Sequence, residues 1–260
     1  MEDKSFRNEK ENIELDKEFN PIKKVKKKKK DNRNLKYTII AALFAIIGVL
    51  LLALPYINDM IINHYASKID VTTIDVNKLK ENLRNTEASF DFSNVTNISA
   101  TEAWTEINSY NEDLIIGRLV VPSLNMNLAL FRGLDGPSLL AGVGTMKADQ
   151  EFGKGNFSIA GHRAKSKDVL FHSLMYAEMD KTIRLSDNDK IYIYRIKDIR
   201  QTDPDALYMI EDSRMKDFGN KPIISLMTCY YGQSDSRYFV TGVLEKVIDY
   251  SEEALLDNKE

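Results

Sequence analysis

The sequence predicts an all-β domain, arranged as a barrel or a sandwich, that follows one membrane-spanning helix. Residues 37–57 contain no charged side chain, which is typical of a helix that crosses a bilayer. At least seven short apolar segments with turn residues between them follow residue 110, and this pattern is typical of strands. Few helical segments separate the strands, which favours a barrel or sandwich over alternating βα units.

The predicted strands are short, and turn or strand-breaking residues separate them. The first is expected to end at Pro122, and Ser186-Asp187-Asn188-Asp189 is a hairpin signal between two others. Short helical insertions are predicted at residues 138–141 and 170–177. The strands are predicted at residues 115–121, 126–132, 157–160, 182–185, 190–197, 223–228 and 238–246. Roughly 140–150 residues of this kind suffice for one domain with its own core.

The apolar run over residues 37–57 has 21 residues, close to the ~20 that a helix needs to span a bilayer. A cleaved signal peptide is the alternative. Its apolar core is usually only about 7–15 residues long and precedes a small-x-small cleavage site. The sequence Leu-Pro-Tyr-Ile at residues 54–57 provides no such site, so we expect an uncleaved membrane anchor.

Charge asymmetry predicts the orientation of this anchor. Residues 23–36 contain nine basic residues and one acidic residue, whereas residues 59–260 contain 23 basic and 31 acidic residues, a net charge of −8. Because basic flanks stay on the cytoplasmic side, we expect a single-pass cell-membrane protein whose N-terminus is cytoplasmic and whose C-terminal domain is extracellular. The lysine run fits contact with anionic membrane lipid better than binding of nucleic acid, and the acidic remainder also argues against nucleic acid.

The same patterns divide the chain into five parts. Residues 1–36 are expected to be a disordered basic cytoplasmic tail, and residues 37–57 the transmembrane helix. Residues 58–104 are predicted to be an extracellular stalk, in which Asp75 caps a short helix with Val76, Leu79 and Leu83 on one face. The extracellular β-domain is expected over residues 105–250, and residues 251–260 are expected to form a C-terminal tail.

Cys229 is the only cysteine of the chain and follows the predicted strand over residues 223–228. Exported proteins usually carry cysteines in pairs, so a single cysteine outside the cell indicates a reactive thiol. The alternative is a small buried hydrophobic side chain, which is what many lone cysteines are. A cysteine nucleophile also needs a group that stabilises its thiolate and a donor for the charge that develops on the attacked carbonyl.

His162 and Arg237 are the candidates for these two roles. His162 follows a glycine at the end of a predicted strand, where loops present functional groups, whereas His64 and His172 are expected at the surface. Arg237 comes eight residues after Cys229, so two antiparallel strands would place its guanidinium and the thiol at one rim of the sheet. A guanidinium stays charged and offers several donors. A structural histidine and a surface arginine are the alternatives.

Ile159-Ala160-Gly161-His162, Leu226-Met227-Thr228-Cys229 and Arg237, in this order behind an N-terminal anchor, resemble the motifs of the sortases, most closely those of class A. The resemblance covers residues 105–250. It implies a closed eight-stranded β-barrel with short helices. It also implies a cysteine transpeptidase that cleaves Leu-Pro-x-Thr-Gly sorting signals between Thr and Gly. The acyl group then passes to a cell-wall amine, so that surface proteins become attached to peptidoglycan.

The resemblance also implies a role for each site residue. Cys229 would be the nucleophile, His162 the general acid and base, and Arg237 the clamp on the carbonyl or oxyanion. Residues 202–212 are expected to form a mobile groove wall. Three further residues match positions that line the peptide groove, although the serine stands where several relatives have threonine: Ala160, Ser225 and Met227. Thr228, just before the nucleophile, is also expected in this substrate site, where it would contribute a hydrogen-bond donor.

The expected partners are surface proteins that bear a sorting signal, the amine of a peptidoglycan precursor, and membrane lipid. No cofactor is expected to be required and no metal-ligand cluster is evident. No acidic cluster maps onto the calcium site of some class A members, which leaves calcium activation open. Two other functions stay open: a secreted cysteine peptidase that acts by hydrolysis, and a non-enzymatic membrane-tethered β-barrel binding module with an inert thiol.

Overall fold

The computed structural model describes residues 32–92, 105–106, 109–230 and 236–258. The chain divides into two compact units, residues 1–51 and 52–260. The first described element is the helix α2, Asn32–Ala66, which contains the predicted apolar helix over residues 37–57. This helix is long and apolar enough to cross a membrane. In the first unit its large apolar side chains are exposed, Phe44 by 68%, as lipid-facing residues would be.

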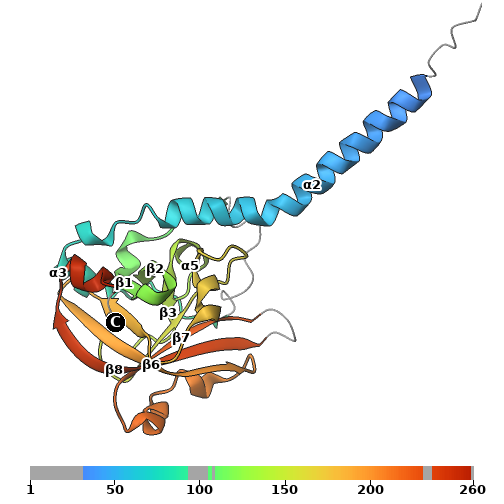
Figure 1. Cartoon of the computed structure of the whole chain (residues 1–260). Helices are drawn as coiled ribbons and strands as arrows, with labels where there is room; N and C mark the ends of the chain where they lie inside the picture. Colours follow the sequence, from blue (N-terminus) through green and yellow to red (C-terminus); the bar gives the residue numbers. More distant parts are fainter. Residues whose placement is uncertain (1–31, 93–104, 107–108, 231–235, 259–260) are drawn as a thin grey trace, which may run out of the picture. The chain divides into compact units, whose positions relative to one another are not determined.

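Eight strands of the second unit form a closed barrel in the order β1-β2-β3-β4-β7-β8-β6-β5 (Figure 1). This confirms the predicted all-β fold. Neighbouring strands are antiparallel, except that β2 pairs parallel with β3 and β4 pairs parallel with β7. The strands are β1 Ile115–Val121, β2 Met126–Phe131, β3 Val143–Thr145, β4 Asn156–Ala160, β5 Thr182–Ser186, β6 Lys190–Thr202, β7 Ile223–Cys229 and β8 Arg237–Asp249.

The sequence pattern predicts seven of these strands and misses β3. With only three residues, β3 is too short to show an alternation of apolar and polar side chains. Strands β6 and β8 are longer than predicted and pair with each other from Lys190 to Thr202. The β6 extension, residues 198–202, is mostly polar and so hides the strand pattern. The barrel interior is a continuous apolar core that includes Phe157, Tyr194, Ile224, Leu226 and Val240.

Short helices connect and cover the strands. Asp75 caps the helix α3, Val76–Asn82, by accepting a hydrogen bond from the amide of Asn77 at 2.8 Å, as predicted. The two predicted helical insertions correspond to α5, Gly136–Ala141, and to the 3₁₀ helix η6, Phe171–Tyr176. The remaining described short helices are η2 Val71–Thr73, η4 Glu112–Leu114, η5 Pro122–Leu124, η7 Leu207–Met209, η8 Asp212–Phe218 and α6 Glu252–Leu256.

Residues before and after the barrel pack onto it. Ile62, at the end of α2, lies in an apolar cluster with Leu140, Ala164, Val169 and Leu170. Val71 and Leu79 lie in another with β1 and β2 side chains, including Ile115 and Phe131. Leu255 of α6 packs against Val120, Ile191 and Ile193. The described parts of the predicted stalk and tail therefore add to the core of the second unit.

We expect Leu79→Ala to destabilise the protein, because Leu79 is 1% exposed. Loss of a buried leucine side chain costs about 2–5 kcal/mol. Urea unfolding of the purified protein in detergent, followed by circular dichroism, would measure the change. Val247→Ala is the control, since Val247 is 45% exposed and surface changes stay within about 0.5 kcal/mol. Equal stability of the two variants would contradict docking of α3 on the barrel.

Candidate active site

Three neighbouring strands, β4, β7 and β8, end or begin at one rim of the barrel. In the parallel pair, Ala160 of β4 lies opposite Met227 of β7. The amide of Gly161 continues this pairing by donating to the carbonyl of Met227 at 3.1 Å. His162 and Cys229 are each two residues beyond the Ala160–Met227 pair, so the same rim carries both.

Cys229 and Arg237 are direct partners in the antiparallel pair of β7 and β8. The next pair outward is hydrogen-bonded, since the amide of Tyr230 donates to the carbonyl of Ser236 at 2.9 Å. Because hydrogen-bonded and non-hydrogen-bonded pairs alternate, Cys229 and Arg237 form a non-hydrogen-bonded pair, in which side chains approach most closely. The register that the sequence predicted for these two residues is therefore present, and both are half-buried.

His162 lies in a tightly packed position at the end of β4. It is 4% exposed, and its carbonyl accepts a hydrogen bond from the amide of Phe171 at 3.0 Å. A side chain on the preceding Gly161 would meet the Phe171 ring at 2.7 Å and Val143 at 2.9 Å, so glycine is needed there. His172 is half-buried and its Nδ1 lies 2.7 Å from the carbonyl oxygen of Ala164, whereas His64 is exposed.

The segment after His162 is held by the end of α2. The carboxylate of Asp59, only 6% exposed, accepts a hydrogen bond from the amide of Ser166 at 2.5 Å. An isolated antiparallel β-bridge pairs Arg163 with Leu170, so the backbone of this segment folds back on itself. The sequence gives no local signal for the Asp59 contact, because the two residues are 107 positions apart.

An apolar hollow of about 90 Å³ lies on the outer face of the sheet beside this rim. Met227 and Arg237 line it, and so do residues of the predicted groove wall over 202–212. The mobility of that wall stays a prediction. The lining residues are Phe92, Met146, Pro204, Ala206, Leu207, Ile210, Met227, Arg237 and Phe239.

The other predicted groove residues are fully buried, with 0% exposure for Ala160, Ser225 and Thr228. Ala160 packs in the apolar cluster with Met227 and Phe239, beneath the hollow. The Ser225 hydroxyl donates to the carbonyl of Met209 at 3.3 Å, and the Thr228 hydroxyl donates to that of Gly161 at 2.9 Å. These three side chains support the site from within the fold, and direct contact with a substrate stays a prediction for them.

Two buried polar residues that sequence reasoning did not single out fix the wall of the hollow to the sheet. The side-chain amide of Asn156 donates to the carbonyls of Met209 and Glu211 at 3.0 and 3.1 Å. Arg214, 4% exposed, donates to the Thr241 hydroxyl at 2.8 Å and pairs with a carboxylate of β6. Their partners lie far away in the sequence, so no local pattern could reveal these roles.

An ion pair joins the loop between β3 and β4 to η8. The Lys147 ammonium lies 2.7 Å from a carboxylate oxygen of Asp212, and the same carboxylate accepts the amide of Asn156 at 3.0 Å. Desolvation acts to raise the pKa of Asp212, but these hydrogen bonds and the Lys147 charge together lower the pKa below its ordinary value. Among the residues that the structure describes, no group of three His, Cys, Asp or Glu side chains could hold a metal ion.

Comparison with known proteins identifies the family. The sortase domain model matches residues 119–245. Sortase A of Listeria monocytogenes is 31% identical over 221 residues, covering 85% of this chain and 96% of that protein. The chain belongs to the sortase family. Sortase A of Streptococcus agalactiae is 28% identical and covers 82% of this chain and 86% of that protein.

The solved structure of Listeria monocytogenes sortase A has the same fold, with a TM-score of 0.50 and 27% identity, covering 56% of this chain and 99% of that one. The family resemblance drawn from the three motifs is thus confirmed, and the similarity to proteins named sortase A supports class A. Membership in this family makes the protein a cysteine transpeptidase of the kind that attaches surface proteins.

We expect Asn156→Ala to destabilise the protein by about 1–3 kcal/mol, because it leaves the buried carbonyl of Met209 and the partly buried carbonyl of Glu211 without their donor. Thermal unfolding in detergent would measure the change. Asn127→Ala is the matched control, since Asn127 is exposed on β2. If the two asparagine variants unfold at the same temperature, the wall does not depend on Asn156.

Proposed function

We propose that this protein is a membrane-anchored sortase A-type transpeptidase that cleaves Leu-Pro-x-Thr-Gly sorting signals between Thr and Gly. The observation that carries this proposal is the close Cys229–Arg237 pair, with His162 on the neighbouring strand end and an apolar hollow beside it. Such a site combines a nucleophile, an acid–base group and a fixed cation at the edge of a surface that accepts apolar side chains.

The proposed reaction has two acyl transfers. The Cys229 thiolate attacks the Thr carbonyl carbon, a C–S bond forms, and the C–N bond to Gly breaks as His162 protonates the leaving amine. An incoming amine then gives a proton to His162, forms a new C–N bond and expels the thiolate. Arg237 donates hydrogen bonds to the carbonyl oxygen on which negative charge develops. The apolar hollow lined by Met227 and Phe239 suits the Leu and Pro side chains of the signal.

The proposed setting is the cell surface. The apolar helix α2 would anchor the chain as a single pass, and the basic residues before it would keep the N-terminus cytoplasmic and contact anionic membrane lipid. The partners would then be surface proteins with a sorting signal and the amine of a peptidoglycan precursor. The alternative of a hydrolytic peptidase uses the same first step and differs only in whether water or an amine resolves the acyl-enzyme.

Mass spectrometry of the protein with a Leu-Pro-x-Thr-Gly peptide tests the first step. We expect a covalent adduct with the mass of the peptide up to Thr, formed by the parent and absent in Cys229→Ala. An added amine peptide should convert the adduct to a ligation product. A folded Cys229→Ala protein that still cleaves the peptide would exclude the thiol as nucleophile. If the acyl-enzyme releases only the free carboxylic acid of the Thr-terminated peptide, even when an amine is present, the protein is a hydrolytic peptidase.

We expect His162→Ala to lower turnover by about 10²–10⁴-fold, the usual contribution of a general acid–base group. His172→Ala is the matched control. His172 lies at the far end of the segment that follows His162, and its Nδ1 contacts the carbonyl oxygen of Ala164. Initial rates on the same peptide would compare the two. Similar losses in both variants would remove His162 from the reaction.

We further propose that the enzyme needs no calcium. The Lys147 ammonium joins the β3–β4 loop to Asp212 without a metal ion, and no group of three His, Cys, Asp or Glu side chains among the described residues could hold one. A chelator should therefore leave the turnover number of the parent unchanged, and added calcium should not raise it. A severalfold loss of turnover with the chelator, restored by calcium, would contradict the proposal.

A further inference from the structure

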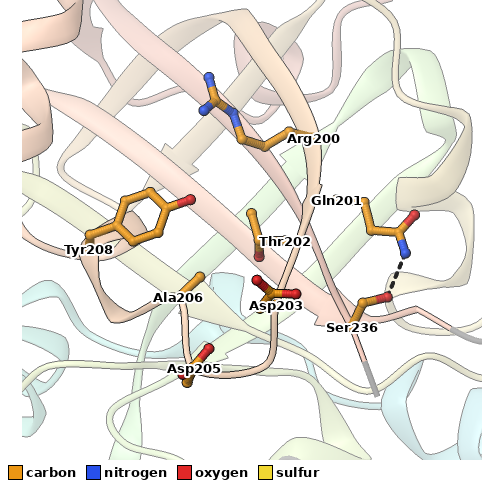
Figure 2. Close-up of a pocket in the computed structure, with 8 residues that line it drawn as sticks. All are labelled: Arg200, Gln201, Thr202, Asp203, Asp205, Ala206, Tyr208 and Ser236. Carbon is orange, nitrogen blue, oxygen red and sulfur yellow. Dashed lines mark hydrogen bonds between the residues drawn. The ribbon is translucent and has the colours of Figure 1, made fainter. Parts of the chain in front are cut away.

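A second, polar hollow of about 820 Å³ lies beside the apolar one. Strand β6 and the segment after it supply most of its lining, and Ser236 immediately precedes β8 (Figure 2). The Gln201 side chain donates to the Ser236 hydroxyl at 2.6 Å and links the two sides. The lining residues are Arg200, Gln201, Thr202, Asp203, Asp205, Ala206, Tyr208 and Ser236.

The two hollows meet at Arg237. Arg237 lines the apolar hollow, while its partner across the β6–β8 pair, Thr202, and the residue before it, Ser236, line the polar one. Ala206 borders both hollows, so the segment over residues 203–208 separates them. Adjacent strands lie about 4.8 Å apart, so Thr202 is about 10 Å from Cys229, a span of roughly three extended residues.

The polar hollow carries negative charge. The guanidinium of Arg200 is held by both carboxylate oxygens of Asp198 at 2.8 and 2.7 Å, and Asp198 also pairs with Arg214. Among the lining side chains one arginine stands against two aspartates, Asp203 and Asp205, a net charge of −1. Asp203 and Asp205 are exposed, and neither side chain forms an ion pair or hydrogen bond within the described part of the chain. The Thr202 hydroxyl oxygen is buried and likewise has no hydrogen-bond partner among the described residues. The hollow therefore offers two carboxylates to a ligand, above a buried hydroxyl oxygen that has no partner within the described part of the chain.

We propose that the polar hollow binds the acceptor of the transfer reaction, a short cationic peptide amine, with Asp203 and Asp205 facing its ammonium groups. This inference rests on the proposed function, because a transpeptidase needs a second substrate beside the acyl-enzyme. The carboxylates gather the acceptor and hold an ammonium group that does not react. The reacting amine loses its proton to His162, forms the C–N bond at the thioester carbonyl, and the C–S bond to Cys229 breaks.

Two acceptors that differ by one ammonium group test the proposal: glycyl-lysine amide and glycyl-norleucine amide. The full protein in detergent would receive a Leu-Pro-x-Thr-Gly peptide and either acceptor. The readout is the ratio of ligation product to hydrolysis product at fixed acceptor concentration. We expect the parent to give about a tenfold higher ratio with glycyl-lysine amide, as two exposed ion pairs would provide. The double variant Asp203→Asn/Asp205→Asn should lose this preference.

The double variant Glu178→Gln/Glu253→Gln is the matched control, because it removes the same charge from exposed positions elsewhere. It should keep the preference of the parent. A parent that does not distinguish the two acceptors would overturn the proposal, and so would an Asp203/Asp205 variant that keeps the preference. If that variant instead slows formation of the acyl-enzyme, the hollow belongs to the donor peptide and the proposal is also wrong. A parent that forms no acyl-enzyme would overturn the proposed function itself.

Discussion

The parallel pairing of β4 with β7 is the constraint on which the site depends. Parallel strands end at the same rim, and this brings His162 next to Cys229 although the residues lie far apart in the sequence. Strand β8 is antiparallel to β7 and begins at that rim with Arg237. Because side chains alternate between the faces of a sheet, a slip of one residue would turn Cys229 into the barrel core. The buried hydrogen bond from Thr228 to Gly161 holds this register where the strands end.

The outer face beside the rim owes its shape to one long connection between β6 and β7. Asn156 and Arg214 fix its later part through buried hydrogen bonds. A buried donor or acceptor that is left without a partner lowers the stability of the folded protein. Its earlier part, residues 203–208, is more exposed and separates an apolar hollow from a polar one. A base held by buried hydrogen bonds with an exposed ridge above it would suit the two substrates of different polarity that we propose.

The sequence predicts those parts of this architecture that local patterns record. Seven strands, the Asp75 cap and the pairing of Cys229 with Arg237 follow from alternation, capping chemistry and a short polar loop. Strand β3 is too short for such a pattern. Asp59, Asn156 and Arg214 act on partners 107, 53 and 27 positions away, and nothing beside them in the sequence marks those contacts. The buried positions of Ala160, Ser225 and Thr228 likewise follow from the barrel and not from their motifs.

The close approach of the Arg237 and Cys229 side chains can be measured directly in Arg237→Cys, because the chain has one natural cysteine. The Cα atoms of a non-hydrogen-bonded antiparallel pair are about 4.5 Å apart, within the range of about 4.4–6.8 Å that a disulfide spans. Mild oxidation of the protein in detergent, followed by alkylation and intact mass, should show an intramolecular disulfide. Phe239→Cys, one pair further along β8 on the same face, should keep two alkylated thiols. Two alkylated thiols in oxidised Arg237→Cys would contradict the register that places the guanidinium beside the nucleophile.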